Sequence, residues 1–307
     1  MPAVDIIVRT KNRPLFLPRA LDDILSQEFT DWHLYVIVDG GDPVPVQQML
    51  DERGYGDRAT LLPQPDPVGL PALSNIAIAA GSSEFIAIHD DDDTWHPQFL
   101  ARTVEHLRRT DDVAVAVRTE IVWEQQIGKV LQETGRELFH PLMQEVTYFD
   151  LVRFNHMVPI SMLFRRSAFD DLGPFDERCE VVDDWVFNLN LALTGRYGFL
   201  GDEPLAHWHQ RPGSRGDAGN TVIDRISDHI RDDRRVRDRA VRAFVQEHGP
   251  GGLLYLAKYI EERTGELHSR LDRIEEQQED ILRILRATAD ERSKESWVKS
   301  RLRELRG

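Results

Sequence analysis

The stretch IAIHDDDDTWHP, residues 86–97, places four consecutive aspartates directly behind a run of alternating apolar residues. Two like charges about 4 Å apart repel by roughly 1 kcal/mol in water and by several times that near a protein surface. The run is therefore either an acidic turn that hydrogen-bonds its own backbone or a site for something positive. Residues two apart in an extended chain face the same way, so we expect Asp90 and Asp92 to converge and Asp91 to point into solvent.

Outward from this stretch, strand-like and helix-like segments alternate over the first 120 residues. Strand-like runs cover residues 4–8, 34–39, 59–64 and 85–90, and helical patterns lie between them at 14–27, 45–54 and 70–81. This alternation predicts an α/β fold with a mainly parallel central sheet and right-handed crossovers. Ligands of such sheets bind outside the carboxyl ends of the strands. Three polar turns fall at those ends, RTKNRP (9–14), DGGD (39–42) and DDDD (90–93), and we expect them to form one lip for a charged ligand.

Charge and composition exclude some classes of function. The formal net charge of −15 over 307 residues disfavours non-specific binding to nucleic acid. Cys179 is the single cysteine, so neither a disulfide framework nor a thiolate zinc cluster is expected. The sequence has no signal-peptide pattern and no apolar run of about 18 residues. We expect a cytoplasmic protein, with loose contact at the inner face of the membrane left open.

Two further motifs lie in the second half of the chain. VVDDWVFNLNLALTG predicts a helix that carries Asp183 and Asp184 in its first turn. The helix dipole alone explains acids at that position, so taken by themselves they favour a structural role. HWHQR reads as an extended segment with His207 and His209 on one side and Trp208 on the other.

The chain changes character after residue 225. A charged helical segment is followed by the break GPGG and then by one long helical pattern. Its seam has alternating spacings of four and three: Leu267, Leu271, Ile274, Gln278, Ile281, Leu285 and Thr288. This spacing predicts a coiled coil that pairs subunits, and a helix folded back on the α/β domain is the alternative. We therefore expect an α/β domain over 1–225, a helical extension over 226–262 and a coiled-coil oligomerisation helix over 263–307.

Several segments resemble one enzyme family. IAIHDDDDTWHP is similar to the DxD region of the family 2 glycosyltransferases, inverting enzymes with the GT-A fold. IIVRTKNRP, VIVDGGD, LFRRSAFDDLGPFDE and VVDDW resemble other motifs of that family in the expected order, and the resemblance covers about residues 4–215. It implies a metal-dependent, hexosyltransferase-type enzyme that moves a sugar from a UDP-, GDP- or dTDP-linked donor to a hydroxyl. The implied acceptor is a glycan or lipid-linked molecule, as in the synthesis of bacterial surface polysaccharides.

The same resemblance implies roles for individual residues. Asp184 matches the general base, and Asp183 stands where the family usually has glutamate, which leaves its role open. Asp92 would bind the Mn²⁺ or Mg²⁺ ion, because hard divalent cations prefer oxygen ligands, and His209 would contact the metal or the diphosphate. The residues implied to bind the nucleotide are Thr10, Arg13, Asp39, Asp90, Asp91 and Arg211. For Asp90 the alternative to the donor's ribose is the metal, and for Arg211 the alternatives are phosphate and metal.

Two other classes of function remain open on the sequence alone. A nucleotidyltransferase can also carry acids at strand ends, but it usually has a glycine-rich first loop, which RTKNRP lacks. A non-catalytic scaffold could bind a sugar nucleotide and act through the coiled coil. The acids present at both key motifs argue against that scaffold.

Overall fold

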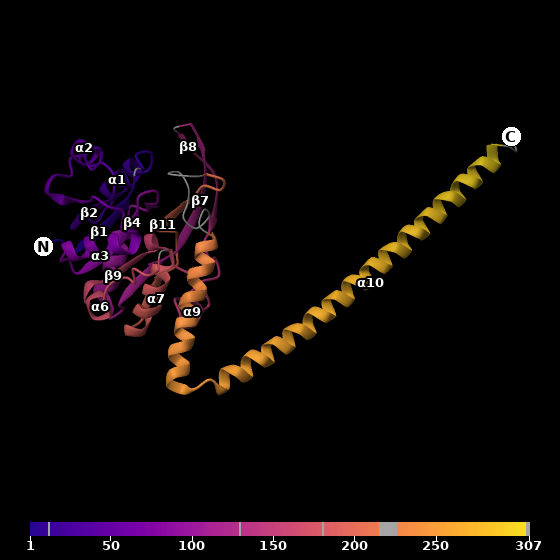
Figure 1. The fold of residues 1–307 in the computed structure, drawn as a ribbon. Coiled ribbons are helices and arrows are strands. Elements are labelled where there is room, and N and C mark those ends of the chain that lie inside the picture. Colours follow the sequence, from indigo (N-terminus) through magenta and orange to yellow (C-terminus); the bar gives the residue numbers. More distant parts are fainter. Residues whose placement is uncertain (12, 129, 180, 215–225, 305–307) are drawn as a thin grey trace. The chain divides into compact units, whose positions relative to one another are not determined.

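A mixed sheet forms the centre of the computed structural model. The structure describes residues 1–11, 13–128, 130–179, 181–214 and 226–304, and in the last helix it describes side chains as far as residue 286. Among these residues the sheet has seven strands in the order β10-β6-β9-β4-β1-β2-β3 (Figure 1). They are β1 (Val4–Thr10), β2 (Trp32–Asp39), β3 (Ala59–Gln64), β4 (Phe85–Asp90), β6 (Ala114–Val117), β9 (Met162–Arg165) and β10 (Tyr197–Leu200). Neighbouring strands pair in parallel except β9, which is antiparallel to β4 and β6. The predicted mainly parallel sheet is confirmed.

A second sheet was not predicted. Its order is β5-β11-β7-β8, and its strands are β5 (Thr94–Trp95), β11 (Ala206–Gln210), β7 (Thr119–Ile127) and β8 (Val130–Leu138). Figure 1 shows β7 and β8 as a long hairpin beside β11. Most side chains of β8 are exposed and polar, so this strand lacks the apolar alternation by which a half-buried strand is recognised.

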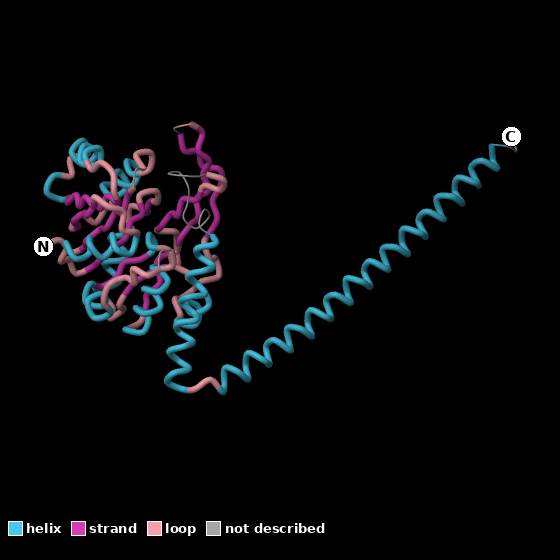
Figure 2. Tube along the Cα trace, in the orientation of Figure 1, coloured by secondary structure: helices cyan, strands magenta, loops and turns pink. Residues whose placement is uncertain are grey.

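Helices cover both faces of the central sheet (Figure 2). They are α1 (Leu17–Leu25), α2 (Val44–Glu52), α3 (Leu70–Ala80), α4 (Phe99–Arg109), α5 (Tyr148–Arg153), α6 (Arg166–Leu172) and α7 (Asp183–Thr194), with short 3₁₀ turns at Gly56–Arg58 and Pro159–Ser161. Strand β1 is buried along its whole length, as parallel strands are. Its Ile6 packs into the cluster that contains Leu21 of α1, whereas Ile7 packs into the cluster that contains Leu73 of α3.

The chain forms two compact units, Met1–Arg237 and Asp238–Gly307. Helix α9 (Ile226–His248) begins in the first unit, and α10 (Gly251–Glu304) makes up most of the second. Gly249 and Pro250 separate α9 from α10, and the φ of Gly249, 76°, is a conformation that suits glycine. The predicted domain limits and the oligomeric role of the last segment stay predictions. Among the described residues no helix combines the length and the apolar content of a membrane span.

Candidate active site

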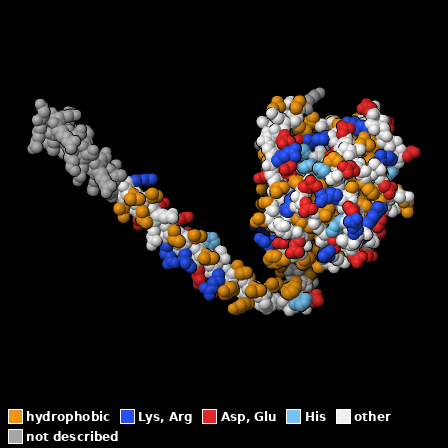
Figure 3. Space-filling view, turned by 180° about the vertical axis from the view of Figure 1, so that it is seen from behind, with side chains coloured by type: hydrophobic (Ala, Val, Ile, Leu, Met, Phe, Trp, Pro, Cys, Tyr) orange, Lys and Arg blue, Asp and Glu red, His pale blue; other side chains and the backbone are white. Residues whose placement is uncertain are grey.

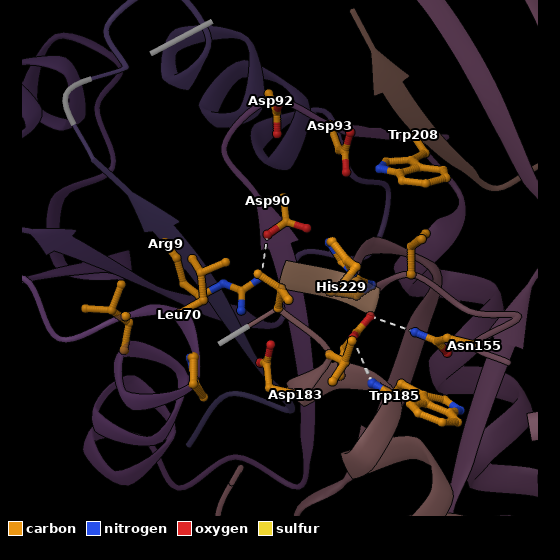
Figure 4. A pocket seen from close by; sticks show the side chains of 18 of the residues that line it. Arg9, Leu70, Asp90, Asp92, Asp93, Asn155, Asp183, Trp185, Trp208 and His229 are labelled. Atoms are coloured by element: carbon orange, nitrogen blue, oxygen red, sulfur yellow. Dashed lines mark hydrogen bonds and ion pairs between the residues drawn. The ribbon is translucent and has the colours of Figure 1, made fainter. Parts of the chain in front are cut away.

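The carboxyl ends of β1, β2 and β4 open into one cavity of about 1160 Å³. Thr10, Asp39 and Asp90 line it at those three strand ends, as the sequence predicted. Asp183 and Asp184, in the first turn of α7, line the same cavity. The fold therefore brings together two acidic motifs that lie about ninety residues apart in the sequence (Figure 4).

The four aspartates of the run have different surroundings. Asp91 is 2% exposed and accepts hydrogen bonds from Thr10 Oγ1 (2.7 Å) and Arg13 Nη1 (2.6 Å). The expectation that Asp91 points into solvent is therefore wrong, because Thr10 at the end of β1 and Arg13 on the loop after it give its carboxylate buried partners. Burial raises the pKa of Asp91 to about 7, although Arg13 opposes the shift.

Asp92 lies between two guanidinium groups. Its Oδ2 accepts a hydrogen bond from Arg13 Nη2 (2.8 Å) and another from Arg211 Nη2. Burial alone would raise the pKa of Asp92, but these two cations hold it below its ordinary value. Arg211 is fully buried, stacks 4.4 Å over the Phe16 ring and also pairs with Glu124 (3.2 Å). Both arginines are thus fixed beside Asp92, but only Arg13 is among the described residues that line the cavity, since Arg211 is fully buried, and their predicted contact with a diphosphate stays a prediction.

His209 belongs to the other face of β11. Trp208 and Gln210 of this strand line the cavity, whereas His209 Nε2 lies 2.9 Å from Thr94 Oγ1 and its Nδ1 lies 3.0 Å from Glu124 Oε1. Its backbone N–H donates to Asp93 Oδ1 (2.8 Å), which ties the aspartate run to β11. The structure does not bring the His209 imidazole into the cavity, and its predicted contact with metal or diphosphate stays an untested prediction.

Asp39 lies where the turn after β2 meets the cavity. Gly40 and Gly41 follow it with φ values of 75° and 87°, a conformation that glycine adopts without strain. Asp39 Oδ1 accepts a hydrogen bond from the Val68 backbone (2.9 Å), and its Oδ2 lies 3.5 Å from Lys11 Nζ. The Asp39 carboxylate is therefore fixed at the edge of the cavity.

Asp183 and Asp184 are two neighbouring acids in a poorly solvated position. Asp184 Oδ2 accepts a hydrogen bond from Asn155 Nδ2 (2.7 Å), and its Oδ1 accepts one from the Trp185 backbone (2.7 Å). Burial, followed by the adjacent charge of Asp183, raises the pKa of Asp184 to about 7. Burial also raises the pKa of Asp183, to about 6, with Arg9 opposing the shift. A carboxylate with a pKa near neutrality can accept a proton from a reacting hydroxyl at physiological pH.

Arg9 is a site residue that the sequence reasoning missed. It is 6% exposed at the end of β1, where its Nη2 lies 2.5 Å from Asp90 Oδ1 and its Nη1 donates to Ser74 Oγ (3.2 Å). Figure 4 shows its guanidinium between Asp90 and Asp183, so one cation faces both acidic motifs. The available signal was its place as the first residue of the polar turn RTKNRP, at the end of a strand. Asn155 gave no such signal, because it lies in an irregular loop.

The described residues contain no group of three or more His, Cys, Asp or Glu side chains placed to hold a metal ion. Mg²⁺ needs only one or two carboxylates when substrate phosphates and water complete its shell, so this finding leaves Asp90 and Asp92 as suitable donors. A metal at Asp92 would have to share or replace the contacts that Arg13 and Arg211 make with Oδ2.

The known proteins that this chain resembles are glycosyltransferases or proteins of glycan biosynthesis. The family model for glycosyl transferase family 2 matches residues 5–173. An uncharacterized glycosyltransferase of Bacillus subtilis, YwdF, is 25% identical over 62% of this chain and 68% of its own length. The O-antigen biosynthesis protein RfbC of Myxococcus xanthus is 27% identical over 71% of this chain but 18% of its own length. A PGL/p-HBAD biosynthesis glycosyltransferase of Mycobacterium bovis is 24% identical over 73% of this chain and 82% of its own.

Solved structures share the fold at low sequence identity. S. aureus TarS 1-349 in complex with UDP-GlcNAc is 16% identical, with a TM-score of 0.58 over 71% of this chain and 61% of that one. The mannosyltransferase PcManGT from Pyrobaculum calidifontis, in complex with GDP-Man and Mn²⁺, is 21% identical, with a TM-score of 0.51 over 70% of this chain and 58% of that one. The likeness therefore covers about three fifths of each of those chains, and it confirms the predicted GT-A fold.

Proposed function

Since this chain belongs to glycosyl transferase family 2, we propose that it transfers a sugar, with inversion, from a nucleoside-diphosphate donor to an acceptor hydroxyl. One observation carries the proposal: the aspartate run and the Asp183–Asp184 pair line a single cavity, and the pKa of Asp184 is raised to about 7. A panel of UDP-, GDP- and dTDP-sugars, each assayed for metal-dependent release of the nucleoside diphosphate, tests it. Release of pyrophosphate in place of the nucleoside diphosphate would favour a nucleotidyltransferase.

The donor would lie across the ends of β1, β2 and β4. We assign Thr10, Asp39, Asp90 and Asp91 to holding the nucleotide and its surroundings, and Arg13 and Arg211 to the diphosphate. Guanidinium groups form strong, paired hydrogen bonds with phosphate, and these two are already fixed beside Asp92. Relatives in fold bind UDP-GlcNAc or GDP-Man, which supports a nucleotide-sugar donor without choosing between uracil and guanine.

Asp184 would accept the proton of the acceptor hydroxyl. The hydrogen bonds from Asn155 and the Trp185 backbone fix its carboxylate, and Asp183 beside it favours uptake of the proton. As the oxygen of the acceptor bonds to the anomeric carbon, the bond from that carbon to the donor phosphate breaks, and the electron pair leaves with the nucleoside diphosphate. Arg13 and Arg211 would stabilise the charge that develops on that leaving group.

A divalent cation, Mn²⁺ or Mg²⁺, would be held by Asp92 and Asp90 together with the donor phosphates. The oxygen donors suit a hard cation, and Asp92 keeps its pKa low, so it is ionised and able to bind one. When bound, the metal would supply positive charge to the leaving diphosphate. The Mn²⁺ present with GDP-Man in PcManGT supports this part of the proposal.

The acceptor would be a component of a surface polysaccharide or glycolipid. The supporting observations are the names of two relatives, an O-antigen biosynthesis protein and a PGL/p-HBAD biosynthesis glycosyltransferase. A cytoplasmic location with loose contact at the membrane stays part of this proposal.

Replacing Arg9 with glutamine should shift the pH dependence of transfer. The carboxylate of Asp184 must be ionised to act, so the wild-type kcat/KM should fall about tenfold per unit below pH 7. Arg9 lowers the pKa of both Asp183 and Asp184, so its loss should move the midpoint upward by about one unit. The measurement is kcat/KM from pH 5.5 to 9.

Arg9→Lys keeps the charge and should restore most of the original midpoint. Arg53→Gln is the matched control, because Arg53 pairs with the exposed Asp22 (2.7 Å) on the surface. A lower rate with an unchanged midpoint would mean that Arg9 acts only through packing.

The C-terminal helix would pair two copies of the chain. Its apolar residues Leu267, Leu271 and Ile274 are 57%, 55% and 48% exposed, too much apolar surface for an isolated helix of 54 residues. In Figure 3 hydrophobic side chains recur along this helix between charged ones. The alternating spacing of four and three places them on one seam, with Gln278 as a polar position that can fix the register.

Leu271→Asp should convert the full-length chain from a dimer to a monomer in sedimentation equilibrium, because a charge in the seam would be buried without a partner. Ser269→Asp, on the outer side of the same helix, is the control and should leave the mass unchanged. A wild-type chain that sediments as a monomer at micromolar concentration would contradict the pairing.

A further inference from the structure

The half of the cavity beyond Asp184 has a different character from the donor half. Its lining includes Phe139, Phe154, Trp185, Trp208 and Ile230, which are aromatic or apolar, together with the imidazoles of His140 and His229. Phe139 and Trp208 meet edge to face, with ring centroids 5.3 Å apart. Figure 4 shows Trp208 and Trp185 on the same side of the cavity, away from Arg9. Aromatic faces of this kind pack against the apolar faces of sugar rings and against hydrocarbon.

The apolar lining includes Phe154, which follows directly on helix α5 in the chain. Asn155 donates to Asp184, and its neighbour Phe154 lines the cavity while remaining 41% exposed. On α5, Tyr148, Phe149 and Val152 are 44%, 71% and 44% exposed. Their spacing puts these three side chains on one face of the helix. The exposed apolar side chains of α5 thus directly precede, along the chain, the two residues that reach the cavity and the base, and we call Phe154 with Tyr148, Phe149 and Val152 the apolar strip.

Helix α5 presents this strip rigidly. Thr147 Oγ1 caps the helix by accepting from the Asp150 backbone (3.1 Å), and Leu151 is buried beneath it. Trp185 Nε1, next to the base, donates to Leu151 O (2.6 Å). Arg237 of α9 donates to Val152 O (2.9 Å) and to Arg153 O (2.7 Å). The exposed apolar face is thus anchored to the same residues that position Asp184.

The charges on this half oppose an anionic acceptor. Among the described lining residues, Asp233 and Arg234 of α9 carry opposite charges, His229 of the same helix is an imidazole, and Glu177 pairs with Asn75 of α3 (3.0 Å), so this half has no excess of arginine or lysine. Burial lowers the pKa of His140 to about 4, so this imidazole is neutral at physiological pH. Phosphate recognition normally needs arginine or lysine in excess of acids. The chain's net charge of −15 likewise disfavours docking on an anionic membrane surface.

We propose that this half of the cavity binds an uncharged acceptor glycoside whose apolar aglycone lies across the exposed face of α5. The inference rests on the proposed glycosyl transfer, since it is the acceptor hydroxyl at Asp184 that places the aglycone over Phe154 and α5. The aromatic lining would hold the sugar ring, and Tyr148, Phe149 and Val152 would cover the hydrocarbon. The strip thereby selects acceptors by their apolar part.

The test compares methyl β-D-glucopyranoside, n-octyl β-D-glucopyranoside and n-octyl phosphate as probes, with binding to the full-length protein measured by calorimetry. The octyl glucoside should bind at least tenfold more tightly than the methyl glucoside, which corresponds to the burial of about two methylene groups. It should also bind at least tenfold more tightly than octyl phosphate. Phe149→Ser combined with Val152→Ser should reduce the octyl preference to less than threefold and leave the binding of the methyl glucoside unchanged.

Leu193→Ser is the matched control, because Leu193 is an exposed apolar side chain (68%) near the far end of α7. It should leave all three affinities unchanged. Donor binding and donor hydrolysis are measured separately on each variant. Failure of those two assays in the wild type would overturn the proposed transfer, whereas the alkyl probes report on the strip alone.

Several outcomes would overturn the proposal. Equal or undetectable binding of the two glucosides, or an octyl preference that survives the double substitution, would show that the strip does not bind an aglycone. Tighter binding of octyl phosphate would identify an anionic acceptor. If the double substitution abolished binding to phosphatidylcholine vesicles, or lowered the oligomeric mass, then the strip would be a contact with a bilayer or with a second copy of the chain.

Discussion

Replacing Asp184 with asparagine is expected to lower the rate of sugar transfer by about 10²–10⁴-fold and to leave the affinity for the donor unchanged. The amide cannot accept the acceptor's proton, yet it keeps the size of the carboxylate and can still accept from the Trp185 backbone. The residues assigned to the donor lie at the ends of β1, β2 and β4 and in the arginine pair, so they are untouched. Single-turnover product formation measures the first quantity, and calorimetry with the nucleotide-sugar measures the second.

Stability provides an internal check on the same variant. The folded state raises the pKa of Asp184 from 3.8 to about 7, so it binds this proton more tightly than the unfolded chain does. The group therefore contributes stability that is fully present below about pH 4 and lost as the pH rises through 7. Asp184→Asn should consequently melt at the same or a higher temperature than the wild type at pH 8. Asp171→Asn, an exposed acid on α6, should change neither rate nor melting, and undiminished transfer by Asp184→Asn would remove Asp184 as the base.

The strands around the cavity could be predicted because local pattern and burial agree there. Val4–Thr10 and Phe85–Asp90 are short apolar runs in the sequence and buried parallel strands in the structure. The polar turns that follow these strands were expected to lie close together, since parallel strands have their carboxyl ends at the same edge of a sheet. Strand β8 and the last three residues of β7 are exposed, and most side chains of β8 are polar, so no local pattern distinguishes β8 from a loop.

The partners of the acidic groups could not be predicted, because they come from segments far away in the sequence. Asp91 was expected in solvent, and only the packing against the end of β1 and the loop after it shows that Thr10 and Arg13 bury it. Period-two alternation in β11 correctly separated Trp208 from the two histidines, yet it gave no indication of which face lines the cavity. Asn155 and Asp184 are twenty-nine positions apart, with β9 and α6 between them, and no local sequence pattern indicates that the two side chains meet.

Replacing Asp92 with asparagine should separate the contribution of the metal from that of the arginines. Without this carboxylate, the strengthening of UDP or GDP binding by Mn²⁺ should fall by about 100-fold, since a metal contributes several kcal/mol at a phosphate. In the absence of metal, however, nucleotide affinity should rise. Arg13, which lines the cavity, would lose the Asp92 carboxylate that now accepts from its Nη2 and would offer that hydrogen bond to the diphosphate. Calorimetry with and without Mn²⁺ measures both effects.

The experiment is decisive because Asp92→Asn should weaken the effect of Mn²⁺ on nucleotide affinity and should raise nucleotide affinity without metal. Arg211 is fully buried, so losing Asp92 should also cost about 3 kcal/mol of stability, which added nucleotide should largely restore. Asp22→Asn, which removes an equal charge from an exposed pair with Arg53, is the control and should alter neither affinity. Weaker binding in the absence of metal would mean that Asp92 orders the arginines for the phosphate and does not compete with it. An unchanged response to Mn²⁺ would place the metal elsewhere, and Asp92 would then serve the arginines alone.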